Sequence, residues 1–133
     1  MKKLLVLALV IIVLAGACEK TSDSTDEFSN SLALGTGMNA SNFTLVGEGT
    51  VFQHGTTIYF RLESKDDMAG SDVRIAINPV GTSNYENRDY PSLQDYGHIT
   101  ISSFSVANPG NYTATGILIT GNKTIASVNF TIQ

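Results

Sequence analysis

His98 and Asp95 come closest to an acid–base pair in this sequence, because they lie three residues apart. A histidine exchanges protons near neutral pH, and a neighbouring carboxylate can orient its ring. No nearby serine stands in a Gly-x-Ser-x-Gly turn, the setting that exposes the nucleophile of many hydrolases. We therefore interpret His98 as a histidine at the end of a strand, with a catalytic role beside Asp95 as the alternative.

A second group of ionisable residues, between residues 63 and 72, is acidic and includes Asp66, Asp67 and Asp72. Calcium binds six or more oxygen atoms and can use such carboxylates, but their spacing differs from the twelve-residue EF-hand pattern. We favour a solvated turn rich in aspartate, with these three residues as the alternative calcium ligands. The two histidines are far apart and Cys18 is the only cysteine, so we predict no zinc site and no cofactor.

Residues 84–96 hold three of the five tyrosines, separated by amide, acidic and arginine side chains. Tyrosine mixed with such groups is typical of surfaces that recognise a protein or a glycan. The candidate binding residues are Tyr85, Arg88, Tyr90 and Tyr96. The alternative is a long loop between two sheets, whose tyrosines cover the end of the core.

The elements that must position these residues are predicted to be β-strands. Apolar and polar residues alternate over residues 57–64, 72–78 and 126–132. A period of two is typical of a strand with one buried face and one solvated face. These three segments therefore indicate a sheet that is wet on one side.

Weaker patterns fill the remaining sequence. Residues 97–104 place Ile99 and Ile101 on one face, whereas Phe104 falls out of phase and indicates a bulge or a strand end. Residues 111–120 form a longer strand that is partly apolar on both faces.

Two short apolar pieces, residues 43–46 and 50–53, are consistent with an edge strand that breaks and changes sheet. No window shows the apolar spacing of three and four that a helix requires, and turn residues recur about every ten positions. About seven short strands in some hundred residues predict a β-sandwich.

One local motif makes this prediction more specific. The turn Asn108-Pro109-Gly110-Asn111-Tyr112 resembles the entry into strand F of immunoglobulin-like domains, where the pattern is Asp-x-Gly-x-Tyr-x-Cys. The resemblance implies that Tyr112 is a tyrosine-corner residue, with its hydroxyl bonded to backbone upstream. Asn108 and Ala114 replace the family's Asp and Cys, and its disulfide and strand-C tryptophan are absent from the sequence. We expect residues 32–133 to form an immunoglobulin-like antiparallel β-sandwich of about seven strands.

The N-terminus has the pattern of an export signal. Lys2 and Lys3 precede an apolar run over residues 4–14, which is shorter than the roughly 20 residues that a membrane-spanning helix needs. Leu14-Ala15-Gly16-Ala17-Cys18 resembles the lipobox of bacterial lipoproteins, although Ala15 stands where most lipoboxes carry Leu. The resemblance implies a helical signal peptide over residues 1–17, then lipidated Cys18 and a flexible tether over residues 18–31.

Cleavage after Ala17 would remove 17 of the 133 residues and two of the eight basic side chains, changing the formal charge from −4 to −6. An acidic chain without a basic cluster argues against nucleic acid as a partner, so the lipid on Cys18 is the predicted membrane contact. Glu19 differs from the Asp that retains some lipoproteins in the inner membrane, which favours the outer membrane or the cell surface.

The predicted function is a membrane-anchored, non-catalytic module that binds a protein or glycan partner through its loops. The alternative is a small envelope enzyme, or an accessory subunit of one, that uses His98 and Asp95.

Overall fold

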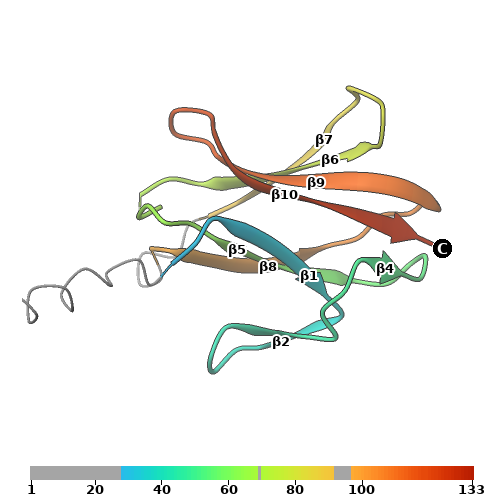
Figure 1. Cartoon of the computed structure of the whole chain (residues 1–133), viewed down its shortest axis with the longest axis horizontal. Helices are drawn as coiled ribbons and strands as arrows, with labels where there is room; N and C mark the ends of the chain where they lie inside the picture. Colours follow the sequence, from blue (N-terminus) through green and yellow to red (C-terminus); the bar gives the residue numbers. More distant parts are fainter. Residues whose placement is uncertain (1–27, 69, 92–96) are drawn as a thin grey trace, which may run out of the picture.

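The structure is a computed structural model, and it describes residues 28–68, 70–91 and 97–133. Cys18, the predicted signal peptide and most of the predicted tether lie outside these residues, as do Asp95 and Tyr96. The described residues form ten β-strands and no helix, so they contain no helix long and apolar enough to span a membrane. The chain is an all-β sandwich of two packed sheets, as the alternation predicted (Figure 1).

The smaller of the two packed sheets has three antiparallel strands in the order β1-β5-β8. Their bounds are Ser31–Gly35 for β1, Ile58–Glu63 for β5 and Ile99–Phe104 for β8. Every second side chain of β5, namely Ile58, Phe60 and Leu62, is completely buried. The alternation seen in the sequence therefore reflects one face against the other sheet and one face outside.

The larger sheet has five strands in the order β4-β10-β9-β6-β7. Their bounds are Val51–Phe52 for β4, Lys123–Ile132 for β10, Gly110–Leu118 for β9, Val73–Pro79 for β6 and Glu86–Tyr90 for β7. All neighbours are antiparallel except β4, which runs parallel to the end of β10.

A short hairpin separates β1 from β4. It consists of β2 (Gly37–Asn39) and β3 (Thr44–Val46), and it lies on the outer side of the smaller sheet (Figure 1). The Nε atom of Arg61 on β5 donates a hydrogen bond to the Phe43 carbonyl at 2.9 Å, which ties the hairpin to that face. The chain therefore passes from the smaller sheet to the larger one between β1 and β4, as predicted. Residues 43–46 belong to the hairpin and not to the edge strand that changes sheet.

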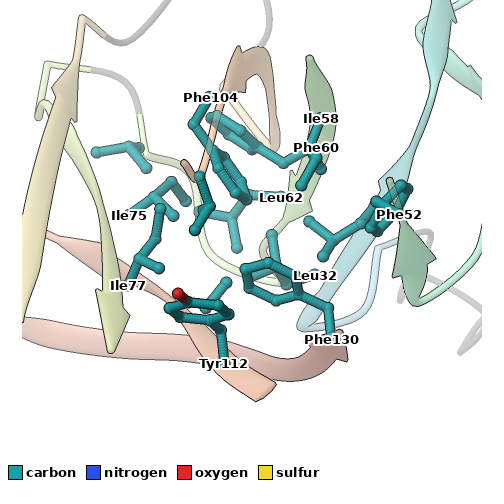
Figure 2. Close-up of a cluster of buried hydrophobic side chains, with 14 of the residues drawn as sticks. Leu32, Phe52, Ile58, Phe60, Leu62, Ile75, Ile77, Phe104, Tyr112 and Phe130 are labelled. Atoms are coloured by element: carbon teal, nitrogen blue, oxygen red, sulfur yellow. The ribbon is translucent and has the colours of Figure 1, made fainter. Parts of the chain in front are cut away.

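Aromatic side chains from both sheets meet in the core (Figure 2). The Phe60 ring lies 4.9 Å from that of Tyr90 and 6.3 Å from that of Phe104. Phe130 in turn lies 5.9 Å from Phe104 and 5.6 Å from Tyr112. At such separations aromatic rings add specific contact energy to the burial of their apolar surface, so this series of rings holds the two sheets together.

The strand order is that of an immunoglobulin-like sandwich. β6, β9 and β10 are neighbours in the larger sheet, as strands C, F and G are, and β1, β5 and β8 take the places of strands A, B and E. The Tyr112 hydroxyl donates a hydrogen bond to the Asn108 carbonyl at 2.8 Å, which is the bond of a tyrosine corner. With β7 these make seven main strands, and β2, β3 and β4 are short additions.

The side chains of β8 that face the core are not those that the sequence pattern indicated. Thr100 and Phe104 are buried, at 3% and 4% exposed, whereas Ile99 and Ile101 are half-buried on the outer side. The pairing of β8 with β5 is continuous, so Phe104 marks no bulge; it is the last residue of β8, which confirms the strand end given as the other possibility. Ile101 pairs with Arg61, the residue that holds the hairpin, and the outer face is therefore partly covered there.

The last residues assigned to the tether contact the domain. The backbone N–H of Ser29 donates to Glu63 Oε1 at 2.7 Å, and the N–H of Lys65 donates to Asn30 Oδ1 at 2.8 Å. The Phe28 ring lies on the His98 imidazole. These contacts begin before the predicted domain boundary at residue 32.

Candidate functional site

β7 divides the predicted binding segment between two sides of the larger sheet. Side chains alternate along a strand, so Asn87 and Asp89 lie on the outer face while Arg88 and Tyr90 point to the other side. Tyr85 directly precedes β7 and is two positions from Asn87, so it lies on the outer face as well. Tyr85 is therefore separated from the two residues with which it was grouped in the sequence.

Tyr85 borders a shallow hollow of about 300 Å³ on the outer face, which we call the Tyr85 hollow. Strands β6, β7, β9 and β10 supply the other walls. The lining residues are Arg74, Ala76, Tyr85, Asn87, Thr115, Ile117 and Thr124. Because the neighbouring strands are hydrogen-bonded to each other, these side chains project from a rigid floor.

One ion pair lies along the edge of this hollow. Arg74 donates two hydrogen bonds to the carboxylate of Asp89, from Nε at 2.7 Å and from Nη2 at 3.0 Å. The hydrogen bonds from Arg74 lower the pKa of Asp89, and the same bonds raise the pKa of Arg74. Both groups stay ionised near neutral pH, and the pair carries no net charge.

The tyrosines of this segment have different surroundings. The Tyr90 hydroxyl donates to the Ser103 carbonyl at 2.9 Å, its ring packs edge-on against Phe60, and burial raises its pKa. Tyr85 is 58% exposed and makes no ring contact or side-chain hydrogen bond within the described residues. Tyr90 therefore covers the core, whereas Tyr85 presents a free ring. Tyr96 lies outside the described residues.

Arg88 lines the smaller of two adjoining grooves at the end of the sandwich. Its Nη2 atom contacts Glu86 Oε1 at 2.5 Å and donates to the Ser105 carbonyl at 3.3 Å. The grooves measure about 390 and 370 Å³ and share Glu86, Val106 and Ala107. Tyr85 also lines the first groove, so its ring stands between this end and the outer face.

The three aspartates of the calcium alternative do not gather around one point. Lys123 Nζ binds Asp66 Oδ2 at 2.6 Å, and this hydrogen bond lowers the pKa of Asp66. The carboxylate of Asp67 lies against Gly97, and Asp72 is exposed. Across residues 28–68, 70–91 and 97–133, no three His, Cys, Asp or Glu side chains are placed to hold a metal ion.

His98 is held by backbone and by an aromatic ring. Its Nδ1 atom lies 3.0 Å from the Ser64 carbonyl, and the Phe28 ring stacks on it with centroids 4.3 Å apart. Because a carbonyl oxygen can only accept, Nδ1 is the donor in this hydrogen bond. Asp95, its predicted partner, lies outside the described residues.

The contributions of β6, β9 and β10 to the hollow were not predicted. The sequence pattern assigns no binding role to Arg74, Thr115 or Thr124. These residues are brought together by the register of β9 with its two neighbours, because Arg74 and Thr124 both pair with Ile117 on β9. A single strand does not contain that information, since register depends on which strands are neighbours.

The sequence of the chain matches no protein-family model and no curated protein. The candidate site is therefore defined by the residues of the hollow and their geometry.

Proposed function

We propose that this protein is a lipid-anchored, non-catalytic recognition module of the bacterial envelope, in the outer membrane or at the cell surface. It binds a protein or glycan partner on the surface around Tyr85. The observation that carries the proposal is the free, 58% exposed ring of Tyr85 at the end of the sandwich opposite the point where the N-terminal segment joins it. The lipobox resemblance at Cys18 supplies the anchor.

The strand register gives this arrangement of the two ends. Ser31 pairs with Glu63, the last residue of β5, and Glu63 also pairs with Ile99. The N-terminal segment therefore joins the sandwich at the end that holds the β5–β6 loop. Tyr90 pairs with Val73 at that same end, and β7 runs from there back to Tyr85 at the far end. At about 3.3 Å per residue, a strand of this size separates the ends by roughly 15–20 Å.

A lipid on Cys18 would then leave Tyr85 facing away from the membrane. Phe28 follows Cys18 by ten positions, and a flexible chain of that length has a root-mean-square reach of about 17 Å. The membrane-proximal end would be the one that holds His98 and the acidic loop. In this proposal His98 serves to fix the start of the domain through Phe28 and Ser64.

The test is photo-crosslinking in intact bacteria with the full chain. A photo-reactive amino acid replaces Tyr85 in one strain and Val51, which is 56% exposed on the opposite edge of the larger sheet, in another. We expect position 85 to form discrete adducts that position 51 does not form. We also expect Cys18→Ser to release the chain from the membrane fraction and to remove those adducts. A Cys18→Ser chain that stays in the membrane, or identical adducts from both positions, would contradict the proposal.

A further inference from the structure

We propose that the Tyr85 hollow binds an uncharged oligosaccharide chain laid across the outer face of the larger sheet. This inference rests on the proposed recognition function and names the chemical class of the partner. It depends on three properties of the hollow: free hydrogen-bonding side chains, charge neutrality and one exposed aromatic ring.

The first property is a set of polar side chains that are held in place but unused. Asn87, Thr115 and Thr124 line the hollow, and their side chains make no hydrogen bond within the described part of the chain. Elsewhere on the same face such side chains do pair, for example Thr113 with Asn129 at 2.8 Å. An amide and two hydroxyls can donate and accept, which suits the hydroxyl groups of a sugar.

The strands give these groups a fixed arrangement. Asn87 on β7 pairs with Ala76 on β6, which pairs with Thr115 on β9, so the three lie in one row across the sheet. The next row on this face contains the Arg74–Asp89 pair, Ile117 and Thr124. Groups on rigid strands lose little conformational freedom on binding, which favours affinity.

The second property is the absence of net charge at the hollow. Arg74 is the charged residue of its lining, and both of its hydrogen bonds go to Asp89. An anionic ligand would have to compete with Asp89 for the guanidinium, and a cationic ligand would meet Arg74. A neutral, hydroxyl-rich ligand meets neither obstacle.

The third property is the ring of Tyr85 beside these polar groups. An exposed aromatic ring offers an apolar surface for the C–H face of a sugar ring and adds a hydroxyl at its edge. The apolar contribution of the floor is small, from Ala76, which is 3% exposed, and from half-buried Ile117. The core of a protein–protein interface is usually more apolar and belongs to about 800 Å² of buried surface on each partner. The composition therefore favours a glycan over a protein.

Binding is measured with the full chain purified from membranes in a zwitterionic detergent, because sugar-headed detergents would compete. The probes are hexasaccharides of glucose, mannose, xylose, galactose and N-acetylglucosamine, with hexagalacturonate as the anionic comparison, each at up to about 10 mM. We expect calorimetric titration to detect at least one neutral hexasaccharide and to find hexagalacturonate weaker than it.

The variants separate stacking, hydrogen bonding and general effects. Tyr85→Ala should weaken binding roughly tenfold or more, and Tyr85→Phe should change it less than about threefold. Thr115→Val removes one free hydroxyl at nearly constant shape and should weaken binding roughly three- to tenfold. Val80→Ala is the matched control, because Val80 is 55% exposed and does not line the hollow.

The inference is overturned if no neutral hexasaccharide binds, if hexagalacturonate binds best, or if Tyr85→Ala binds as the wild type does. The proposed recognition function fails by different observations, namely a Cys18→Ser chain that stays in the membrane or crosslinks that do not depend on position 85. If position 85 crosslinks to a protein in cells while no neutral hexasaccharide binds, recognition stands and the glycan inference falls.

Discussion

The ring of Phe28 lies flat on the imidazole of His98, with centroids 4.3 Å apart and ring planes 1° apart. The contact joins the segment that follows the predicted lipid anchor to the loop that precedes β8. Its neighbours, Ser29 and Asn30, are bonded to Glu63 and Lys65. The start of the domain is therefore fixed at the end opposite Tyr85.

This contact should be measurable by a double-mutant cycle. Phe28→Ala and His98→Ala each remove one ring, and the two changes should couple by about 0.5–1.5 kcal/mol of unfolding free energy. Hydrogen exchange at the Ser29 amide should also become faster in Phe28→Ala, because its bond to Glu63 loses support. Additive effects in chemical unfolding would show that the stack does not contribute.

The contribution of the Tyr112 hydroxyl to stability can be measured by comparing the same substitution at Tyr112 and at Tyr85. Tyr112→Phe removes the bond to the Asn108 carbonyl from a residue that is 9% exposed, and it should lower the unfolding free energy by about 1 kcal/mol. Tyr85→Phe removes an exposed hydroxyl and should stay within about 0.5 kcal/mol of the wild type. Equal effects of the two substitutions would mean that the tyrosine corner adds nothing to stability.

Gly116 on β9 faces the buried side chain of Leu62 across the core. A Cβ atom at this position would lie 2.5 Å and 3.0 Å from Leu62 Cδ1 and Cδ2. Gly116→Ala should therefore lower the unfolding free energy by about 1–3 kcal/mol through overpacking. Gly49→Ala is the control, because a Cβ there has no neighbour within 4 Å and the change should be neutral or stabilise by up to about 1 kcal/mol. If Gly116→Ala were as stable as this control, the two sheets would pack less closely than the structure shows.

Much of the fold could be predicted because the strands at its centre have an apolar core face and a more polar outer face. β5 and β6 alternate between apolar and polar residues, and the tyrosine-corner turn before β9 has its own sequence pattern. The phase of β8 was less accessible, since its core face carries Thr100 and its outer face carries Ile99 and Ile101. The β2–β3 hairpin partly covers that outer face. Apolar residues there do not mark the side of β8 that faces the core.

The candidate site was harder to predict than the fold. Residues 86–90 form an edge strand held by backbone pairing, and their polar sequence gives no sign of it. Tyr85 and Tyr90 look equivalent in sequence, yet the alternation of that strand packs Tyr90 partly buried against the core and leaves Tyr85 exposed. The rest of the hollow comes from Thr115 and neighbouring strands far away in the sequence, which only the sheet register brings together.

Acid should weaken the attachment of the N-terminal segment. The hydrogen bond from the Ser29 N–H, followed by that from Arg61, holds the pKa of Glu63 below its ordinary value of 4.5. A depressed pKa in the folded state means that the stabilisation is present above pH 4.5 and is lost as pH falls through the folded value. Chemical unfolding from pH 7 to pH 3 should therefore show a steeper loss of stability for the wild type than for Glu63→Gln. Glu48→Gln, which changes an exposed glutamate, should follow the wild type, and the same slope for all three chains would contradict this assignment.

The central claim, a recognition module fixed to the membrane through Cys18, is tested most directly by mass spectrometry of the N-terminal peptide from chains purified out of the bacterial membrane. We predict that the peptide begins at Cys18 and carries the mass of a diacylglyceryl group, with or without an additional acyl chain. An N-terminus at any other residue, or a Cys18 with a free thiol, would contradict the account.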